Sequence, residues 1–166
     1  YDLYGASPRS YNIPKFYTHF VATSINASTG HPYNTIPLLT AEEALLNRAE
    51  AYVLLGNTAL AIADMNAFIS QNIQGYSASA HNLTNSKLTN YYNAPLQFAA
   101  MYAILDFKRA FFLHEGMRWF DILRWKIPVT HETLEGEQIV LTPEDNRRVL
   151  QLPALTQQAG LAQNPR

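Results

Sequence analysis

Helical spacing of apolar residues after Thr40 predicts the first clear element of this chain. Thr40 and Glu43 are placed as a capping box, in which each side chain accepts a hydrogen bond from the backbone amide of the other residue. Apolar positions then follow one helix face as far as Leu55, and Gly56 supplies the left-handed residue that commonly ends a helix. We therefore expect a helix that begins at residue 41 and ends near Leu55.

A second helix follows after a very short connection. Asn57 or Thr58 can cap it, and helical spacing continues to about Asn72, ahead of Gly75. Its apolar positions are Leu60, Ala61, Ile62, Met65, Phe68 and Ile69. Because so short a connection turns the chain back on itself, we expect an antiparallel helical hairpin over residues 40–73.

Small and aromatic residues of this hairpin match a tetratricopeptide repeat. The matching positions are Ala49, Tyr52, Gly56 and Ala61. The alanines let the two helix backbones approach closely, and the tyrosine fills the groove beside them. The sequence contains one such unit, and a single repeat cannot bury both of its faces, so we expect it to pack against something else.

A further apolar stretch predicts a helix pair over residues 93–127. Asn93 and Pro95 open a helix in which residues 96–113 are apolar almost all round, a pattern typical of a buried helix. After Gly116 the chain continues as a fourth helix, which ends before the next proline.

Residues 1–39 and 128–166 lack helical spacing, and we expect extended and looped structure at both ends. Residues 12–21 have the composition of a strand that is apolar on both faces, so we expect an extended segment lying on a larger body. Glu135 and Gly136 predict a turn between two short strands, followed by a non-helical, proline-containing tail. The predicted fold class is mainly α: a tetratricopeptide-like helical hairpin plus further packed helices, with a short β-hairpin near the C-terminus.

The composition indicates a single domain, residues 1–166, without a nucleic-acid surface. The 166 residues are 48% hydrophobic, so a chain of this length can form one hydrophobic core and does not need a second. The formal net charge is −1, so the chain has no overall positive charge that would attract nucleic acid. The absence of cysteine excludes disulfides, thiolate catalysis and cysteine-ligated zinc. The chain starts at Tyr1 and its first methionine is Met65, so we expect a processed product or a fragment.

Charged and aromatic residues alternate at helical spacing in the predicted fourth helix. The residues concerned are Glu115, Arg118, Trp119, Asp121, Arg124 and Trp125. Arg118, Asp121 and Arg124 are three residues apart on one face, which is the spacing that ion pairs on a helix require. Guanidinium groups and indole rings can also bind a ligand, but for all six residues we favour a structural role in ion pairing and helix packing.

Three tyrosines are the candidate ligand contacts. Tyr76, Tyr91 and Tyr92 lie within residues 74–94, a stretch rich in Ser, Asn and Thr in which we expect a polar loop. Loops of this length inside compact domains are often functional, and an aromatic ring suits the apolar face of a sugar. A loop without a binding role is the simpler interpretation and stays open.

No motif of metal binding or catalysis is complete in this sequence. His114 begins a metalloprotease pattern, but Arg118 stands where its second histidine is required. A calcium site made of carbonyls and carboxylates stays open. A glycoside hydrolase needs two carboxylates across a cleft, and no pair among the thirteen acids is marked by its surroundings. We therefore expect no catalytic residue, no metal site and no cofactor.

Three blocks of the sequence together resemble the C-terminal region of the SusD/RagB family of nutrient-binding lipoproteins. The first block is residues 39–52, followed by Leu55-Gly56-Asn57 and by Asp64-Met65-Asn66 of the predicted second helix. The second is residues 104–106 leading into residues 115–125, Glu-Gly-Met-Arg-Trp-Phe-Asp-Ile-Leu-Arg-Trp, which is the most specific of the three. The third is the Leu-Pro of residues 152–153 with residues 161–165.

The resemblance implies a non-catalytic protein that binds glycans or other nutrients as part of polysaccharide utilisation. Its implied partner is a SusC-like TonB-dependent transporter, and its implied location is the outer-membrane surface, with an N-terminal lipid anchor outside this chain. The chain would be roughly the last third of such a protein, and its hairpin one of several that form the scaffold and the face toward the transporter.

The predicted third helix departs from the family pattern. The family usually has two glutamates where this chain has Phe107 and Phe111, and arginine where it has Lys108. We therefore expect aromatic packing to replace part of an ionic network between this helix and the Arg-Trp segment.

A different class of function stays open beside this resemblance. A stand-alone tetratricopeptide-like module would bind a peptide or protein in the groove of its hairpin. Such a module would carry further repeats of about 34 residues, whereas a SusD-like protein would carry a lipoprotein signal upstream.

Overall fold

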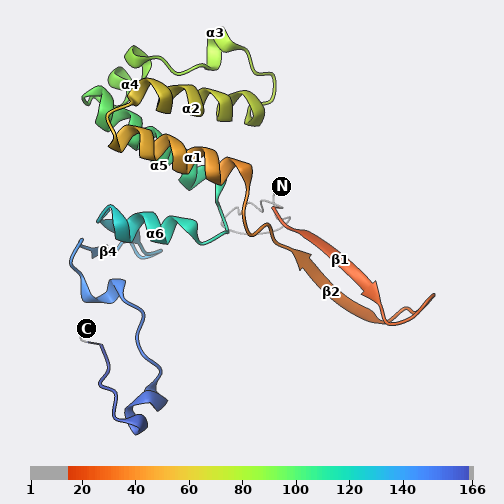
Figure 1. Ribbon diagram of the computed structural model, residues 1–166. Coiled ribbons are helices and arrows are strands. Elements are labelled where there is room, and N and C mark those ends of the chain that lie inside the picture. Colours follow the sequence, from red (N-terminus) through yellow and green to blue (C-terminus); the bar gives the residue numbers. More distant parts are fainter. Residues whose placement is uncertain (1–14, 165–166) are drawn as a thin grey trace. The chain divides into compact units, whose positions relative to one another are not determined.

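A computed structural model describes residues 15–164 and confirms the mainly α-helical fold class (Figure 1). Within that range the chain contains six α-helices, two antiparallel β-hairpins and two 3₁₀ helices. The chain divides into two compact units, Tyr1–Leu83 and Thr84–Arg166. The composition predicts that residues 1–166 form a single domain, and this stays a prediction.

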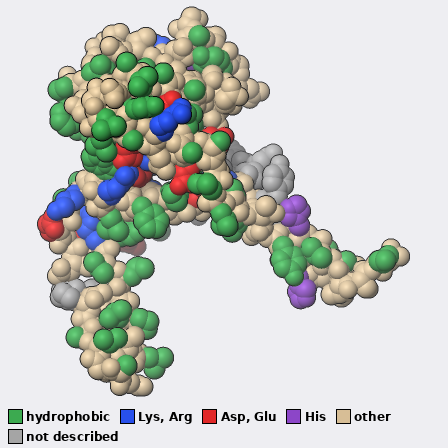
Figure 2. Space-filling view, viewed as in Figure 1, with side chains coloured by type: hydrophobic (Ala, Val, Ile, Leu, Met, Phe, Trp, Pro, Cys, Tyr) green, Lys and Arg blue, Asp and Glu red, His purple; other side chains and the backbone are tan. Residues whose placement is uncertain are grey.

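The first unit begins with an exposed β-hairpin. β1 (Tyr17–Ala22) pairs antiparallel with β2 (Gly30–Thr35) over the full length of both strands. Phe20 and Tyr33 are 61% and 56% exposed, and histidine and hydrophobic side chains stand on the open surface of this hairpin (Figure 2). The segment expected to be extended is therefore a strand of a β-hairpin. The sequence also predicts that it lies on a larger body, but Phe20 and Tyr33 are not covered by other described residues. Residues 12–14 of that segment lie outside the described range.

Gly30 is required at the start of β2 because the strands approach closely there. A Cβ atom on Gly30 would collide with the Val21 carbonyl oxygen and lie 2.6 Å from the Phe20 ring. The intervening turn is closed by a backbone hydrogen bond of 3.0 Å from the Thr23 amide to the Thr29 carbonyl. A turn of this length lacks the two-residue signal of a tight hairpin, so composition alone predicts an extended segment without its pairing.

The predicted helical hairpin is confirmed as α1 (Ala41–Leu54) and α2 (Thr58–Asn72). The Thr40 hydroxyl accepts a hydrogen bond from the Glu43 amide at 3.1 Å, so the capping residue is the predicted one. Gly56 has a φ of +78°, the left-handed conformation expected after the first helix. The two helices lie side by side and pack on each other (Figure 1).

Both helices contribute to the core of this hairpin. Its buried apolar residues are Leu46, Ala49, Val53, Ala61, Ile62, Met65, Phe68 and Ile69. Ala49 and Ala61, at the predicted small positions, are fully buried, which allows the close helix approach that the sequence indicates. Leu60 is 50% exposed, because the apolar run at residues 60–62 is wider than the stripe that faces α1.

An ion pair joins the two helices beside the core. Arg48 on α1 donates from Nε and from a terminal nitrogen to the two carboxylate oxygens of Asp64 on α2, both at 2.8 Å. Asp64 is buried, whereas Arg48 is exposed. The hydrogen bond to Asp64 raises the pKa of Arg48 above its usual value. A two-point contact of this kind fixes the orientation of α1 against α2.

Residues 74–94 are not the polar loop that their composition predicts, so that prediction is wrong. α3 (Ala78–His81) lies in the first unit, and α4 (Asn85–Tyr92) lies in the second. Thr84 caps α4 by accepting a backbone amide hydrogen bond at 3.2 Å. Leu88 is the one buried residue of α4, so this short helix lacks the apolar stripe that sequence reasoning depends on.

Asn66 of α2 holds the segment that follows α3. Its side-chain nitrogen donates to the Leu83 carbonyl at 3.1 Å, and its side-chain oxygen accepts from the Leu83 amide at 2.7 Å. One side chain thereby satisfies both backbone groups of a residue outside regular secondary structure.

Replacing Asn66 with alanine is expected to free this segment. The change removes both hydrogen bonds to Leu83, and we expect the free energy of local opening there to fall by about 1–2 kcal/mol. Hydrogen exchange at the Leu83 amide measures the effect. Asn72→Ala is the matched control, because the Asn72 side chain donates within its own helix, to the Phe68 carbonyl at 2.9 Å. Equal exchange of Leu83 in the two variants would show that Asn66 does not hold the segment.

The second unit contains the predicted helix pair. α5 (Leu96–Phe111) follows Asn93, which adopts a left-handed φ of 47°. α6 (Met117–Arg124) follows Gly116, which has a φ of +75°. Both α4 and α6 pack on α5. The left-handed residues therefore reverse the chain on each side of α5 and bring the three helices together.

One face of α5 is open, so the prediction of a helix buried all round is wrong. The buried residues of α5 are Ala99, Ala100, Met101, Ala103, Ile104, Leu105 and Lys108. Phe98 is 58% exposed and Tyr102 is 47% exposed. Apolar residues all round a helix do not say which side a neighbour covers, and here α4 and α6 leave the side of Phe98 and Tyr102 uncovered.

The predicted C-terminal β-hairpin is confirmed. β3 (Val129–Glu132) pairs antiparallel with β4 (Gln138–Leu141), and Gly136 in the turn has a φ of +83°. The remainder of this end is not wholly non-helical, because η1 (Asn146–Arg148) and η2 (Ala154–Ala159) are 3₁₀ helices. Such short helices have no apolar period, so the sequence pattern misses them.

Arg148 joins separate segments of the second unit. Its two terminal nitrogens donate to the carbonyls of Ile122 at 2.8 Å, Ile127 at 2.9 Å and Thr142 at 2.9 Å. The residue is 5% exposed. Ile122 lies in the last turn of α6 and Ile127 follows the end of this helix, where a positive charge is favourable. Arg148 thus connects η1 to the end of α6.

Candidate functional site

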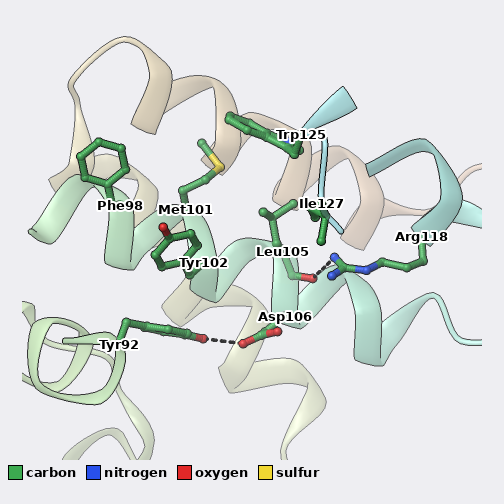
Figure 3. A pocket seen from close by; sticks show the side chains of 9 residues that line it. All are labelled: Tyr92, Phe98, Met101, Tyr102, Leu105, Asp106, Arg118, Trp125 and Ile127. Atoms are coloured by element: carbon green, nitrogen blue, oxygen red, sulfur yellow. Dashed lines mark hydrogen bonds between the residues drawn. The ribbon is translucent and has the colours of Figure 1, made fainter. Parts of the chain in front are cut away.

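The second unit contains a pocket of about 490 Å³ between α4, α5 and the end of α6 (Figure 3). We call it the α4–α6 pocket and define it by its lining residues. These are Tyr92, Phe98, Met101, Tyr102, Leu105, Asp106, Arg118, Trp125 and Ile127. Its volume lies within the range of about 300–1,000 Å³ that is usual for small-molecule sites.

Aromatic rings form much of the pocket wall. Tyr92 comes from α4, Phe98 and Tyr102 come from α5, and Trp125 caps the end of α6. The rings of Tyr92 and Tyr102 are 5.8 Å apart between centroids, with their planes tilted by 49°. Because Phe98 and Tyr102 are about half exposed, flat apolar surface is available to a ligand inside the pocket.

A hydrogen bond between Tyr92 and Asp106 crosses from α4 to α5 (Figure 3). The Tyr92 hydroxyl donates to Oδ2 of Asp106 at 2.9 Å, and Arg109 lies 3.3 Å from Oδ1 of the same carboxylate. Burial, together with the hydrogen bond to Asp106, raises the pKa of Tyr92 well above its usual value. Tyr92 therefore stays protonated at neutral pH, and both oxygens of Asp106 have a partner.

Arg118 reaches the pocket from α6. Its guanidinium donates to the Leu105 carbonyl at 3.3 Å (Figure 3). Within residues 15–164 this neutral oxygen is its hydrogen-bond partner, and it forms no ion pair there. Burial lowers the pKa of Arg118, and the proximity of Arg109 adds to this, while Asp121 and Asp106 oppose it. The pocket wall thus contains a partly desolvated positive charge.

The other charged residues of α6 pair with each other. Arg124 lies 3.1 Å from Oδ1 of Asp121, which is buried, and the Arg124 guanidinium lies 5.8 Å from the centroid of the Trp125 ring. The predicted face of Arg118, Asp121 and Arg124 is therefore divided between a pair within α6 and a contact to α5. Glu115 and Trp119 are half-buried.

The three candidate tyrosines have different surroundings. Tyr92 lines the pocket, and Tyr91 is 80% exposed beside it, with its ring edge-on to Tyr92 at 4.8 Å. Tyr76 lies in the first unit, where its hydroxyl donates to Oδ1 of Asn82 at 2.6 Å and its ring lies 6.0 Å from that of His81. The structure therefore brings two of the three together, on helix α4 and not in a loop.

Several lining residues have no prominent signal in the sequence. The composition of α5 predicts a buried helix. From the sequence, its residues Phe98, Met101 and Tyr102 would therefore be assigned to the hydrophobic core. Tyr102 carries the one usable signal, since a tyrosine in an otherwise apolar helix needs a partner or an opening for its hydroxyl. Arg118 and Trp125, for which the sequence pattern alone favours a structural role, also line the pocket.

Two searches of the described residues, one for metal-holding side-chain groups and one for membrane-spanning helices, find neither. No group of three or more His, Asp or Glu side chains among residues 15–164 could hold a metal ion. In the same range, no helix combines the length and the apolar character needed to cross a membrane.

Comparison with known protein families gives a match over most of the chain. A model described as the SusD family matches residues 3–140. The chain belongs to the SusD family. The matched range contains the helical hairpin and all of the α4–α6 pocket, and it extends on both sides of the hairpin, which argues against a stand-alone tetratricopeptide-like module. Searches of curated proteins and of solved structures return no match.

Membership of the SusD family confirms the resemblance drawn from the capping-box helix and the segment of residues 115–125. It supports a general role in binding glycans or other nutrients, since this is a family of binding proteins. The family match also includes residues 3–38, ahead of the blocks that carry the resemblance. The tail similarity at residues 152–153 and 161–165 lies beyond the matched range and stays a prediction.

The positions at which this chain differs from the usual SusD family pattern in the predicted third helix, Phe107, Lys108 and Phe111, lie on α5. Phe111 is half-buried, and its ring packs edge-on against Phe112 at 5.2 Å, with the planes at 89°. Phe112 is 4% exposed. This aromatic contact lies within the end of α5 itself. The expected aromatic packing between this helix and residues 115–125 stays a prediction.

Proposed function

We propose that this chain is part of a non-catalytic glycan- or nutrient-binding protein at the outer-membrane surface, and that the α4–α6 pocket contacts the ligand. The observation that carries the proposal is an open pocket with four aromatic side chains in its lining, in a chain of the SusD family. Of the candidate tyrosines, Tyr92 would contact the ligand directly and Tyr91 would extend the aromatic surface at the rim. Tyr76 would be a separate contact in the first unit.

Sugar rings suit a pocket of this composition. The C–H face of a pyranose is apolar and packs against an aromatic ring, while its hydroxyls need hydrogen-bond partners. The lining offers both kinds of surface, with Tyr102 and Phe98 half exposed and polar groups at Asp106 and Arg118. A purely apolar ligand would desolvate the remaining N–H donors of Arg118 without giving them a partner.

The carboxylate of the lining supports binding and not hydrolysis. Glycosidases place two carboxyl groups about 5–10 Å apart on either side of the scissile bond. Asp106 is the one carboxylate in the lining, and its two oxygens are engaged by Tyr92 and Arg109. A single, already paired carboxylate cannot act as both acid and base.

Substitution of Tyr102 tests the binding role. Tyr102→Ala removes one exposed aromatic face from the pocket, and we expect about a tenfold loss of affinity for whichever oligosaccharide binds the unmodified chain. Calorimetric titration against a panel of neutral and acidic oligosaccharides measures it. Tyr33→Ala is the control, because Tyr33 is similarly exposed but lies on the hairpin of the first unit. A loss shared equally by both variants, or by neither, would argue against a ligand in the pocket.

The transporter partnership and the lipid anchor are a further part of the proposal, supported by family membership. The expected partner is a SusC-like TonB-dependent transporter, with anchoring through an N-terminal lipid outside the given sequence. Copurification of the natural full-length protein with such a transporter from detergent-solubilised outer membranes is the expected result. Recovery of the protein in a soluble fraction, without a transporter, would contradict this part.

A further inference from the structure

Two acids near the α4–α6 pocket each form an ion pair with an arginine, whereas a third arginine, Arg118, does not form one within the described residues. Asp106 pairs with Arg109 at 3.3 Å, and Asp121 pairs with Arg124 at 3.1 Å. Arg118 lies near both acids and is attracted by each of them, but each acid has a closer arginine of its own. Within the described residues, Arg118 is left with the neutral Leu105 carbonyl.

A guanidinium in this position can accept a further partner. It has five N–H donors in a planar fork, and the contact with Leu105 uses one terminal nitrogen. Arg118 lines the same pocket as Tyr102 and Trp125, and its guanidinium points from α6 toward Leu105 (Figure 3). A group bound to its remaining donors would therefore occupy the pocket that the aromatic rings also line. Carboxylate and sulfate oxygens match this fork and would neutralise its charge.

We propose that the α4–α6 pocket selects an acidic sugar, with Arg118 binding its carboxylate or sulfate while the aromatic side chains pack on the ring. The inference rests on the proposed glycan-binding function of the same pocket. A sugar amine is disfavoured, because Asp106 already has two donors and the nearby Arg118 would repel a cation.

The test compares two ligands with the same sugar rings, one with charged carboxylates and one with neutral methyl esters. The trimer of galacturonic acid and the same trimer as its methyl ester are titrated against the intact chain at low salt, and we expect the acid to bind about ten- to a hundredfold more tightly. A sulfated galactose that competes with the acid, while galactose does not, would extend the selected class to sulfate. Failure of both to compete would restrict the class to carboxylates.

Variants assign the preference to Arg118. Arg118→Gln should remove the preference for the acid over the ester, and Arg118→Lys should retain part of it, because a lysine keeps the charge without the fork. Arg147→Gln is the control for net charge, since Arg147 pairs with Asp145 and does not line the pocket. Circular dichroism of each variant checks the fold, and the acid–ester comparison on the unmodified chain requires no variant.

The outcomes separate the two proposals. Equal affinity for acid and ester, with a loss in Tyr102→Ala, would overturn the acidic-sugar inference and leave the binding pocket intact. A preference for the acid that survives Arg118→Gln or falls equally in Arg147→Gln would also overturn it. Binding of neither trimer, together with no effect of Tyr102→Ala on any oligosaccharide, would overturn both.

Discussion

Replacing Arg148 with alanine is expected to lower the free energy of unfolding of the second unit by about 3–5 kcal/mol. The change removes the donor from three carbonyl oxygens, of Ile122, Ile127 and Thr142. Because Arg148 is 5% exposed, water cannot replace the lost hydrogen bonds without opening the contact between η1 and the end of α6. A lysine at the same position has a single nitrogen and should recover only part of the loss.

Thermal unfolding followed by circular dichroism measures this effect, with an expected fall of more than about 10 °C in the midpoint. The control is the adjacent residue, since Arg147→Ala removes an arginine that pairs with Asp145 at the surface. Asp145 has its pKa lowered to about 2 by that pairing, yet an ion pair with a half-exposed arginine contributes little to stability at neutral pH. Similar midpoints for the two variants would mean that Arg148 does not connect these segments.

Replacing Leu46 with alanine should destabilise the first unit by about 2–5 kcal/mol. Leu46 is fully buried between α1 and α2, so truncation removes apolar contact and leaves a cavity lined by residues that cannot fully relax. Urea unfolding gives the change in free energy, and a fall in the transition midpoint with an unchanged slope is expected.

Leu54 is the matched control for that cavity. It lies on the same helix and is 59% exposed, so Leu54→Ala should change stability by only about 0.5 kcal/mol. The two variants make the same chemical change on one element and differ in burial. If they lowered stability equally, the core assigned to the α1–α2 hairpin would be wrong.

The α1–α2 hairpin was predictable because each of its signals acts within one helical turn. Thr40 caps the helix through an amide three residues away, and Gly56 ends it through its own backbone conformation. The buried alanines at residues 49 and 61 follow from the same pattern. The C-terminal hairpin was predictable for a similar reason, since Gly136 supplies the left-handed residue in its turn.

Helix α4 was not predictable from periodicity. A helix of eight residues with one buried side chain, Leu88, has no stripe to detect, and its Asn and Ser residues favour loops on composition. The cap at Thr84 was the available signal. Pairing of β1 with β2 was missed because it depends on strands brought together by a long turn.

The pocket depends on information that no local pattern contains. Tyr92 was a candidate because of a predicted loop, but it lines the site because α4 places it against Asp106 of α5. The exposure of Tyr102 depends on which side of α5 its neighbours leave open. The role of Arg118 depends on which acids are already taken by Arg109 and Arg124, and spacing along α6 does not reveal that.

Because Trp125 lies in the pocket wall, its intrinsic fluorescence can report whether the pocket is occupied. The sequence contains two tryptophans, and one of them borders the cavity while the other, Trp119, is not among the residues that line it. Cargo that displaces water from beside an indole shifts its fluorescence toward the blue, so occupancy can be followed without a dye or an attached label.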